Sequence, residues 1–177
     1  MKNYLKIMMA GFVGFFAFNS CAGIPKGAVV VRPFDAGKYL GKWYEIARMD
    51  FRFERGLNHT TADYSLNGDG SIQVVNRGYH AEKKQWKEAV GKAKLIGRFK
   101  EARLKVSFFG PFYGNYNVIA LDDQYQYALI AGKNLHYLWI LSREKTIPEK
   151  VCQEYLELAK GLGFDTGALI WVKQDKY

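Results

Sequence analysis

Eight short segments with the character of β-strands follow one another between residues 43 and 142, and only a few residues separate each from the next. Alternating apolar and polar side chains occupy opposite faces of a strand, and residues 102–108 alternate most clearly. Residues 67–70, Asn-Gly-Asp-Gly, tolerate positive φ and are typical of a hairpin turn. The predicted strands are Trp43–Arg48, Leu57–Leu66, Ser71–Tyr79, Trp86–Gly97, Ala102–Phe108, Tyr116–Leu121, Tyr125–Ala131 and Leu135–Ser142.

No helical segment interrupts this series, so consecutive strands are expected to pair as antiparallel neighbours. Eight such strands can close into an up-and-down barrel, which removes exposed edges and leaves room inside for one small ligand. A β-sandwich is the competing architecture, although it usually needs longer crossover connections. The chain is 49% hydrophobic and 16% aromatic, which excludes a disordered chain and suits β-structure around an apolar cavity.

One helix is expected after the strands. Thr146 and Glu149 have the spacing of a capping box, with Pro148 in the first turn. An apolar stripe at helical spacing predicts that the helix packs against the outside of the barrel, and Gly161 or Gly163 can end it. The stripe consists of Val151, Tyr155, Leu158 and Leu162. Residues 168–173 are predicted to form a last short strand.

Residues 1–20 have the composition of a signal peptide. Lys2 and Lys6 precede an apolar run at 7–18, which is shorter than the ~20 residues of a membrane-spanning helix. Cys21 follows directly, in an arrangement that resembles a bacterial lipoprotein signal, although Phe18 and Asn19 depart from its usual form. An ordinary secretory signal is the alternative. We therefore divide the chain into a signal peptide (1–20), a tether (21–27) and one folded domain (28–177).

The lipoprotein resemblance implies that Cys21 is acylated and becomes the first residue. More than one acyl chain makes membrane anchoring stable. Ala22 follows the cysteine, where an aspartate would favour the inner membrane, so an outer-membrane anchor facing the periplasm is expected. Cys152 would then have no intramolecular partner, and we predict a buried, inert thiol on the helix rather than a nucleophile.

Three separated motifs resemble those of the lipocalin family. The first is Gly41-Lys42-Trp43, the second is residues 116–122, and the third is residues 138–143, which end in Arg143. The resemblance implies an all-β fold, an eight-stranded antiparallel up-and-down lipocalin barrel with one C-terminal α-helix packed outside. It also implies that Arg143 lies over Trp43 and closes one end, a role that suits a guanidinium group through cation–π stacking and hydrogen bonds to carbonyls.

Residues 28–173 resemble the bacterial outer-membrane lipocalins in particular, through segments 43–48, 52–57, 106–114 and 137–143. The resemblance implies a carrier or storage protein that binds fatty acids such as palmitate, or lysophospholipids, inside the barrel. An apolar barrel interior is compatible with this function, because it removes an acyl chain from water.

Candidate ligand-binding residues follow from their positions. Arg52 and Arg55, in the loop between the first two strands, would meet a phosphate or carboxylate, or else are solvated charges. Phe112 and Tyr113 lie in an apolar hairpin and would touch ligand or a partner surface, including a second copy in a homodimer. The pocket candidates, each also explained by plain packing, are Tyr64, Tyr79, Trp86, Tyr116 and Trp139.

No catalytic constellation stands out. His59, His80 and His136 are scattered, and the spacings of common metal and serine-hydrolase motifs are missing from the sequence. We expect no enzyme activity, no cofactor and no metal. The alternatives are a weak lipid-modifying enzyme on a lipocalin scaffold, or a binder of another small hydrophobic ligand such as haem through one histidine.

Lys and Arg outnumber Asp and Glu by 26 to 17, a formal net charge of +9 that favours anionic partners. Many of these cations gather in the fourth hairpin: Lys83, Lys84, Lys87, Lys92, Lys94, Arg98, Lys100, Arg103 and Lys105. The run has no regular series of stacking aromatics, and a protein exported to the envelope does not meet nucleic acid, so no nucleic-acid partner is expected. Two explanations of the basic run are left: a solvated face, or attraction to anionic lipid head groups.

Overall fold

The computed structural model describes residues 23–97 and 100–174, so the predicted signal peptide and Cys21 lie outside the described residues. The elements in chain order are α1 (Ala36–Tyr39), β1 (Gly41–Arg48), β2 (Leu57–Leu66), β3 (Ile72–His80), β4 (Gln85–Leu95), β5 (Arg103–Phe109), β6 (Phe112–Leu121), β7 (Tyr127–Ala131), β8 (Leu138–Ser142), α2 (Glu149–Gly161), the 3₁₀ helix η1 (Thr166–Ala168) and β9 (Ile170–Trp171).

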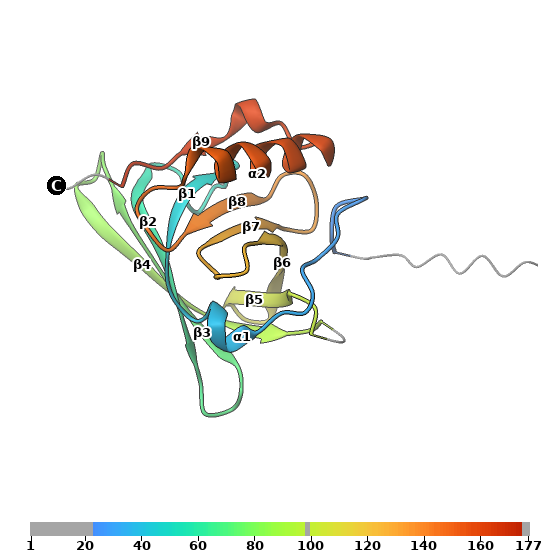
Figure 1. The fold of residues 1–177 in the computed structure, drawn as a ribbon. Coiled ribbons are helices and arrows are strands. Elements are labelled where there is room, and N and C mark those ends of the chain that lie inside the picture. The colour runs from blue at the N-terminus through green and yellow to red at the C-terminus, as the bar shows by residue number, and fades with distance from the viewer. Residues whose placement is uncertain (1–22, 98–99, 175–177) are drawn as a thin grey trace, which may run out of the picture.

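Strands β1 to β8 form a closed antiparallel barrel, which confirms the predicted architecture over the sandwich (Figure 1). Each strand pairs with the next, and β1 pairs with both β2 and β8 to complete the circle. Towards its end β1 leaves β2 and pairs instead with β9, through Ala47 with Trp171 and Arg48 with Ile170. Strands β1 and β2 are therefore separated at the end of the barrel where the β1–β2 loop lies. We call this end the open end.

Strand alternation separates two cores. In β7, Ala128 and Ile130 point into the barrel, whereas Leu129 and Ala131 belong to a second cluster between the barrel wall and α2. This second cluster includes Tyr155 and other residues of the helix, so α2 covers the outside of the barrel. Because side chains in a strand repeat every two residues, one apolar run supplies both cores.

The start of α2 differs from the prediction. Pro148 is its N-cap and no side chain caps the helix, so the capping box is wrong. Thr146 instead accepts a hydrogen bond on its carbonyl from Ser142 Oγ at 2.8 Å. This contact ties the segment before the helix to the end of β8.

The buried stripe of α2 is rotated from the predicted one. It consists of Cys152, Tyr155 and Ala159. Val151 and Leu162 of the predicted stripe are partly buried against the same cluster, whereas Leu158 is 40% exposed. Tyr155 determines the rotation, because its hydroxyl reaches over the barrel wall to donate to the Tyr127 carbonyl at 2.9 Å. Cys152 is buried as predicted, and burial raises the pKa of its thiol.

The bounds of several strands also differ from the predicted ones. Strand β6 begins at Phe112 rather than Tyr116, since Phe109 and Phe112 pair across a tight turn. The final strand covers only residues 170–171. Residues 166–168 before it form η1. Asp165 is its N-cap, and the Asp165 carboxylate accepts from the Gly167 backbone N–H at 3.2 Å.

Residues 23–27, expected within a tether, lie against the barrel wall. Asn117 Nδ2 donates to the Gly23 carbonyl at 2.9 Å, and Pro25 is buried. Gly27 lies beside Leu162 at the end of α2. These contacts hold the segment against β6 and the end of α2.

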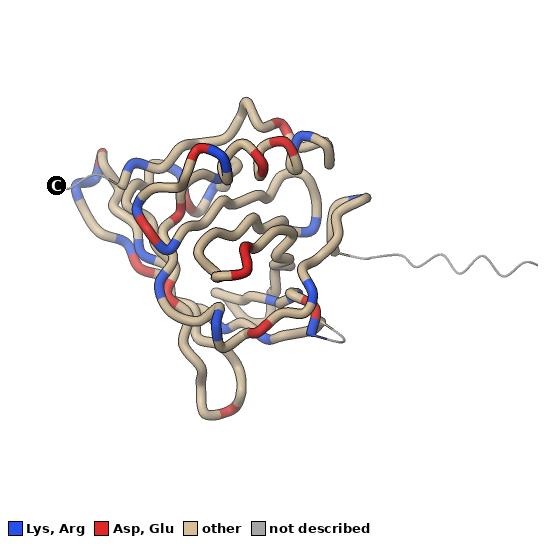
Figure 2. Tube along the Cα trace, in the orientation of Figure 1, with Lys and Arg blue, Asp and Glu red and all other residues tan. Residues whose placement is uncertain are grey.

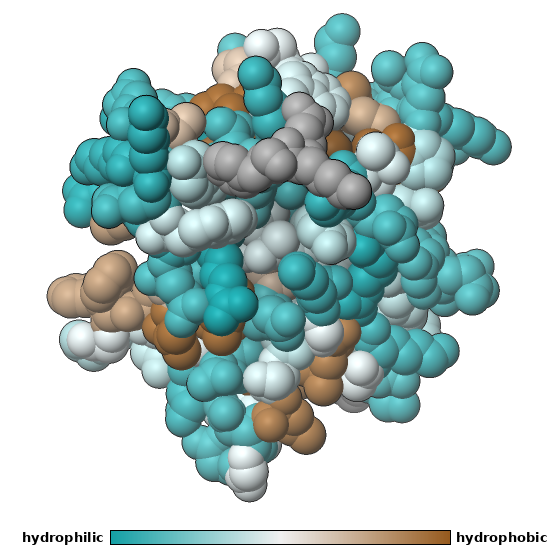
Figure 3. Space-filling model, turned by 90° about the vertical axis from the view of Figure 1, so that its left-hand side faces the viewer, coloured by the Kyte–Doolittle hydropathy of each residue, from teal (hydrophilic) through white to brown (hydrophobic). Residues whose placement is uncertain are grey.

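Lys and Arg are distributed around the barrel and interspersed with Asp and Glu rather than confined to one side (Figure 2). One face of the molecule is mainly hydrophilic, with hydrophobic side chains in separate patches (Figure 3). Within the described ranges no helix is long and apolar enough to cross a membrane.

Candidate functional site

A cavity of about 620 Å³ occupies the barrel and extends to the open end. Its inner wall comes from inward-facing strand residues such as Val74, Val106 and Leu141, and its mouth from the β1–β2, β5–β6 and β7–β8 loops. Cavities that bind small molecules usually measure ~300–1,000 Å³ and are mostly apolar. The size and lining suit one elongated apolar molecule.

The other end of the barrel is closed by Trp43 and Arg143. Trp43 is fully buried and donates from Nε1 to the Tyr39 carbonyl at 2.9 Å. The Arg143 guanidinium lies 3.9 Å from the centroid of the Trp43 ring. It also donates to four backbone carbonyls at 2.8–3.2 Å, those of Lys38, Leu40, Lys42 and Tyr125. The structure thus brings together two residues separated by a hundred positions.

Gly41 makes this contact possible. Its φ is +89°, a conformation that L side chains rarely adopt, and a Cβ there would lie 3.4 Å from Arg143 Nη1. Glycine lets the chain turn from α1 into β1 directly under the guanidinium. The three residues that the sequence singled out, Gly41, Trp43 and Arg143, form one structural unit.

Three tyrosine hydroxyls meet near the bottom of the cavity. Tyr39 Oη and Tyr116 Oη are 2.6 Å apart, and Tyr64 Oη donates to Tyr116 Oη at 3.1 Å. Burial raises the pKa of Tyr64 to about 12 and raises the pKa values of Tyr39 and Tyr116 well above 10.0. The hydroxyls are therefore neutral at physiological pH, and the inner end of the cavity is polar without being charged.

A buried charged cluster lies in the wall nearer the mouth. Arg48 Nη1 donates to Glu45 Oε1 at 2.6 Å, and Arg48 Nη2 donates to the carbonyls of Glu54 and Leu57 at 2.7 and 3.1 Å. Burial, reinforced by the charge of Glu54, raises the pKa of Glu45 to about 8, and burial raises the pKa of Glu54 as well. Two carboxyls thus share one guanidinium, and protonation of one relieves their repulsion.

This cluster predicts that stability falls as the pH rises. In the unfolded chain Glu45 loses its proton above about pH 4.5, whereas in the folded protein it keeps the proton to about pH 8. The stabilisation that comes from this raised pKa is therefore fully present below pH 4.5 and is lost as the pH rises from 4.5 to about 8. Each pH unit of the window lowers the unfolding free energy by ~1.4 kcal/mol for one group. Chemical denaturation of Glu45→Gln, which mimics the neutral acid, should show a flatter pH dependence. An unchanged slope would contradict the assignment.

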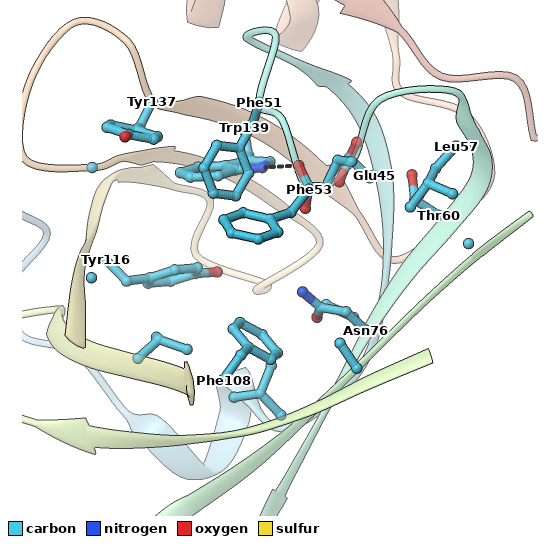
Figure 4. Close-up of a pocket in the computed structure, with 18 of the residues that line it drawn as sticks. Glu45, Phe51, Phe53, Leu57, Thr60, Asn76, Phe108, Tyr116, Tyr137 and Trp139 are labelled. Atoms are coloured by element: carbon cyan, nitrogen blue, oxygen red, sulfur yellow. Dashed lines mark hydrogen bonds between the residues drawn. The ribbon is translucent and has the colours of Figure 1, made fainter. Parts of the chain in front are cut away.

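Aromatic side chains form the mouth. Trp139 Nε1 donates to Glu54 Oε2 at 3.1 Å, and the Tyr137 and Trp139 rings stack with centroids 6.3 Å apart. Phe51 and Phe53, from the β1–β2 loop, lie beside Trp139 and across from Phe108 of β5 (Figure 4). An apolar ligand that enters the barrel passes between these rings.

The structure places the sequence candidates in two groups. Those that line the cavity are Tyr64, Phe112, Tyr113, Tyr116 and Trp139, and those outside the lining are Arg52, Arg55, Tyr79 and Trp86. Val74, Asn76 and Gly78 line the cavity, so alternation turns Tyr79 outward. Trp86 is its partner on the neighbouring strand β4, with ring centroids 5.6 Å apart.

The two arginine candidates have other partners. Arg55 Nη2 pairs with Asp50 Oδ2 at 2.7 Å on the exposed side of the β1–β2 loop. The Arg52 guanidinium lies 4.4 Å from the centroid of the Phe53 ring. Neither side chain lines the cavity, although Arg52 is next to its mouth through Phe53.

Several cavity residues were missed by sequence reasoning, chiefly Glu45, Glu54, Phe53, Phe108 and Tyr137. A signal existed for Glu45, because alternation puts it on the same face of β1 as Trp43. No comparable signal existed for the loop residues, whose positions depend on how the loop folds over the mouth.

The histidines lie elsewhere: none of His59, His80 and His136 lines the cavity. In the part of the chain that the structure describes, no group of three or more His, Cys, Asp or Glu side chains is arranged to hold a metal ion.

A family model described as a lipocalin-like domain matches residues 34–174. The chain is 56% identical over 150 residues to the outer membrane lipoprotein Blc of Citrobacter freundii, covering 85% of each chain. It is 50% identical over 157 residues to the protein of the same name from Vibrio cholerae, covering 88% of this chain and 92% of the relative. Insecticyanin from the tobacco hornworm Manduca sexta has the same fold, with a TM-score of 0.69 at 20% identity and coverage of 87% and 89%.

Proposed function

The chain belongs to the lipocalin family, and from that premise we propose that it carries or stores a fatty acid or lysophospholipid inside its barrel. The observation that carries this proposal is the cavity of about 620 Å³, apolar along its wall, aromatic at its mouth and polar but neutral at its inner end. Burying an acyl chain there contributes ~25 cal/mol per Å² of apolar surface removed from water. A polar head group would remain at the mouth.

The chain is an outer-membrane protein like its relatives named outer membrane lipoprotein Blc. We propose that residues 1–20 are removed as a signal peptide and that acylated Cys21 supplies the anchor. The support is the order of a basic start, an apolar run and then a cysteine. Two or more acyl chains on one residue would hold the protein at the membrane stably.

The carboxyl and hydroxyl groups at the cavity bond to one another and to Arg48, and this favours carriage over catalysis. The carboxyls of Glu45 and Glu54 share Arg48, and the tyrosine hydroxyls bond one another. A carrier releases its lipid unchanged. Haem ligation by a histidine has no support in the cavity wall, because the three histidines lie outside it.

Mass spectrometry of the protein purified from membranes tests both parts of the proposal. Under native conditions a carrier retains one non-covalent lipid, and the denatured chain should carry the mass of acyl groups on a peptide that begins at Cys21. Added lysophospholipid should be recovered intact. Recovery of free fatty acid and the deacylated head group would support an enzyme instead, and a lipid-free native protein that takes up neither lipid would refute carriage.

A further inference from the structure

The described chain begins beside the open end of the barrel. Gly23 packs directly against the Asn115 amide, and its carbonyl accepts from Asn117 Nδ2, which also donates to the carbonyls of Ala131 and Gly132 where β7 ends. The chain reaches the closed end only at α1, which begins at Ala36. The N-terminal segment therefore approaches the domain from the side of the cavity mouth.

This start limits where an anchor can be. Cys21 is two positions before Gly23 in the sequence, and a chain spans at most ~3.6 Å per residue, so an anchor at Cys21 would have a reach of about 7 Å from Gly23. Strands rise about 3.3 Å per residue, so Asn115 is about 10 Å along β6 from Phe112 at the mouth. An acyl group on Cys21 would thus enter the membrane close to the rim of the cavity.

The rim carries an exposed aromatic cluster. Phe112 is 78% exposed, Phe109 66%, Phe53 52% and Tyr113 45%. The rings of Phe53 and Phe109 are 6.0 Å apart, and Phe109 pairs with Phe112 across the β5–β6 turn, so these residues, here called the rim cluster, are continuous. Contiguous exposed apolar side chains of this kind usually mark an interaction surface.

We propose that the rim cluster rests on the phospholipid bilayer, with the cavity mouth facing the membrane. The position of Gly23 selects the bilayer over other occupants, because it brings an anchored Cys21 to this end of the barrel. Lysines at the same end, Lys83 and Lys84 in the β3–β4 turn and Lys133 in the cavity wall, suit anionic head groups. Lipid would then pass between bilayer and cavity without crossing water.

This orientation rests on the proposed anchor at Cys21, but the surface can be tested without it. Unacylated full chain carrying Cys21→Ser is sedimented with vesicles of phosphatidylethanolamine and phosphatidylglycerol. Phe112→Ser should weaken vesicle binding by about tenfold or more, the effect expected when an aromatic side chain that is buried in the bilayer is removed. Leu66→Ser is the matched control, since Leu66 is 65% exposed at the end of β2 by the closed end, and it should leave binding unchanged.

Two results would overturn the proposal. Equal vesicle binding by the Phe112→Ser and Leu66→Ser variants would exclude the rim cluster as the contact. Dissociation of a dimer by Phe112→Ser in vesicle-free solution, with vesicle binding intact, would assign the cluster to a second copy of the chain.

Orientation is then measured on the acylated protein in vesicles. In a Cys152→Ser background, Phe112→Cys should react with a membrane-impermeant maleimide about tenfold more slowly than Leu66→Cys, as expected of a thiol screened by the bilayer. Equal rates in protein that sediments with the membrane would refute the orientation and leave the anchor standing. Failure of the acylated protein to sediment with the vesicles would refute the proposed anchor at Cys21. The sedimentation experiment on the unacylated chain would still test whether the rim cluster binds the bilayer.

Discussion

Trp43→Ala is expected to destabilise the chain by ~3–5 kcal/mol, the cost of truncating a buried aromatic. Trp43 is fully buried, donates to the Tyr39 carbonyl and supports the Arg143 guanidinium. Its loss leaves a cavity beneath an arginine that is tied to four carbonyls. Because Trp43 does not line the ligand cavity, the affinity of folded protein for a fatty acid should change little. Denaturant titration and fluorescent fatty-acid binding measure the two effects.

Arg143→Lys is the companion variant. It keeps the charge but loses the planar fork that reaches Lys38, Leu40, Lys42 and Tyr125, so a smaller loss of stability is expected. If Trp43→Ala kept the melting temperature and abolished binding, Trp43 would be a pocket residue, and the assignment of the open and closed ends would be reversed.

Val106→Trp is expected to weaken lipid binding about tenfold to a hundredfold, because the indole would occupy space that an acyl chain needs. Val106 points inward from the middle of β5 and lines the cavity. Overfilling a packed space typically costs ~1–3 kcal/mol, and ~1.4 kcal/mol corresponds to a tenfold change in affinity. Displacement of a fluorescent fatty acid measures the effect.

The matched control is Val90→Trp. Val90 is 53% exposed on β4 and does not line the cavity, so the same substitution there should leave affinity unchanged. Thermal unfolding of both variants checks that any loss of binding comes from a filled cavity in folded protein. Equal affinity in the two variants would mean that the lipid binds outside the barrel.

The series of antiparallel strands could be predicted because its information is local. Period-two alternation and the Asn-Gly-Asp-Gly turn define hairpins, and antiparallel hairpins in series can close into a barrel. Pattern alone left barrel and sandwich unresolved, and the family motifs decided between them. The Trp43–Arg143 contact joins residues a hundred positions apart, so only the resemblance connected them.

The site was less accessible to sequence reasoning. Alternation from Trp43 would have placed Glu45 inside, and alternation from Val74 would have placed Tyr79 outside, since Val74, Asn76 and Gly78 line the cavity. Phe51 and Phe53 differ, because the β1–β2 loop has no period from which their direction can be read. The arginines of that loop suggested an anion site, yet Arg55 pairs with Asp50 and Arg52 lies over Phe53.

Helix α2 shows a further limit of sequence patterns. The spacing of Thr146 and Glu149 suggested a capping box, but tertiary contact with Ser142 ties the Thr146 carbonyl to the barrel. Tyr155 likewise rotates the buried stripe by reaching the Tyr127 carbonyl. In both cases a contact with the barrel outweighs a local preference of the helix.

Photo-crosslinking with a fatty acid that carries a diazirine near the end of its acyl chain tests the central claim most directly. Peptide mass spectrometry should find the label on residues of the inner wall, such as Val74, Val106 and Tyr116, and excess unlabelled fatty acid should remove it. Labelling confined to the outside of the barrel, for example at exposed Leu158 of α2 or Trp171 of β9, would contradict a lipid carried in the cavity.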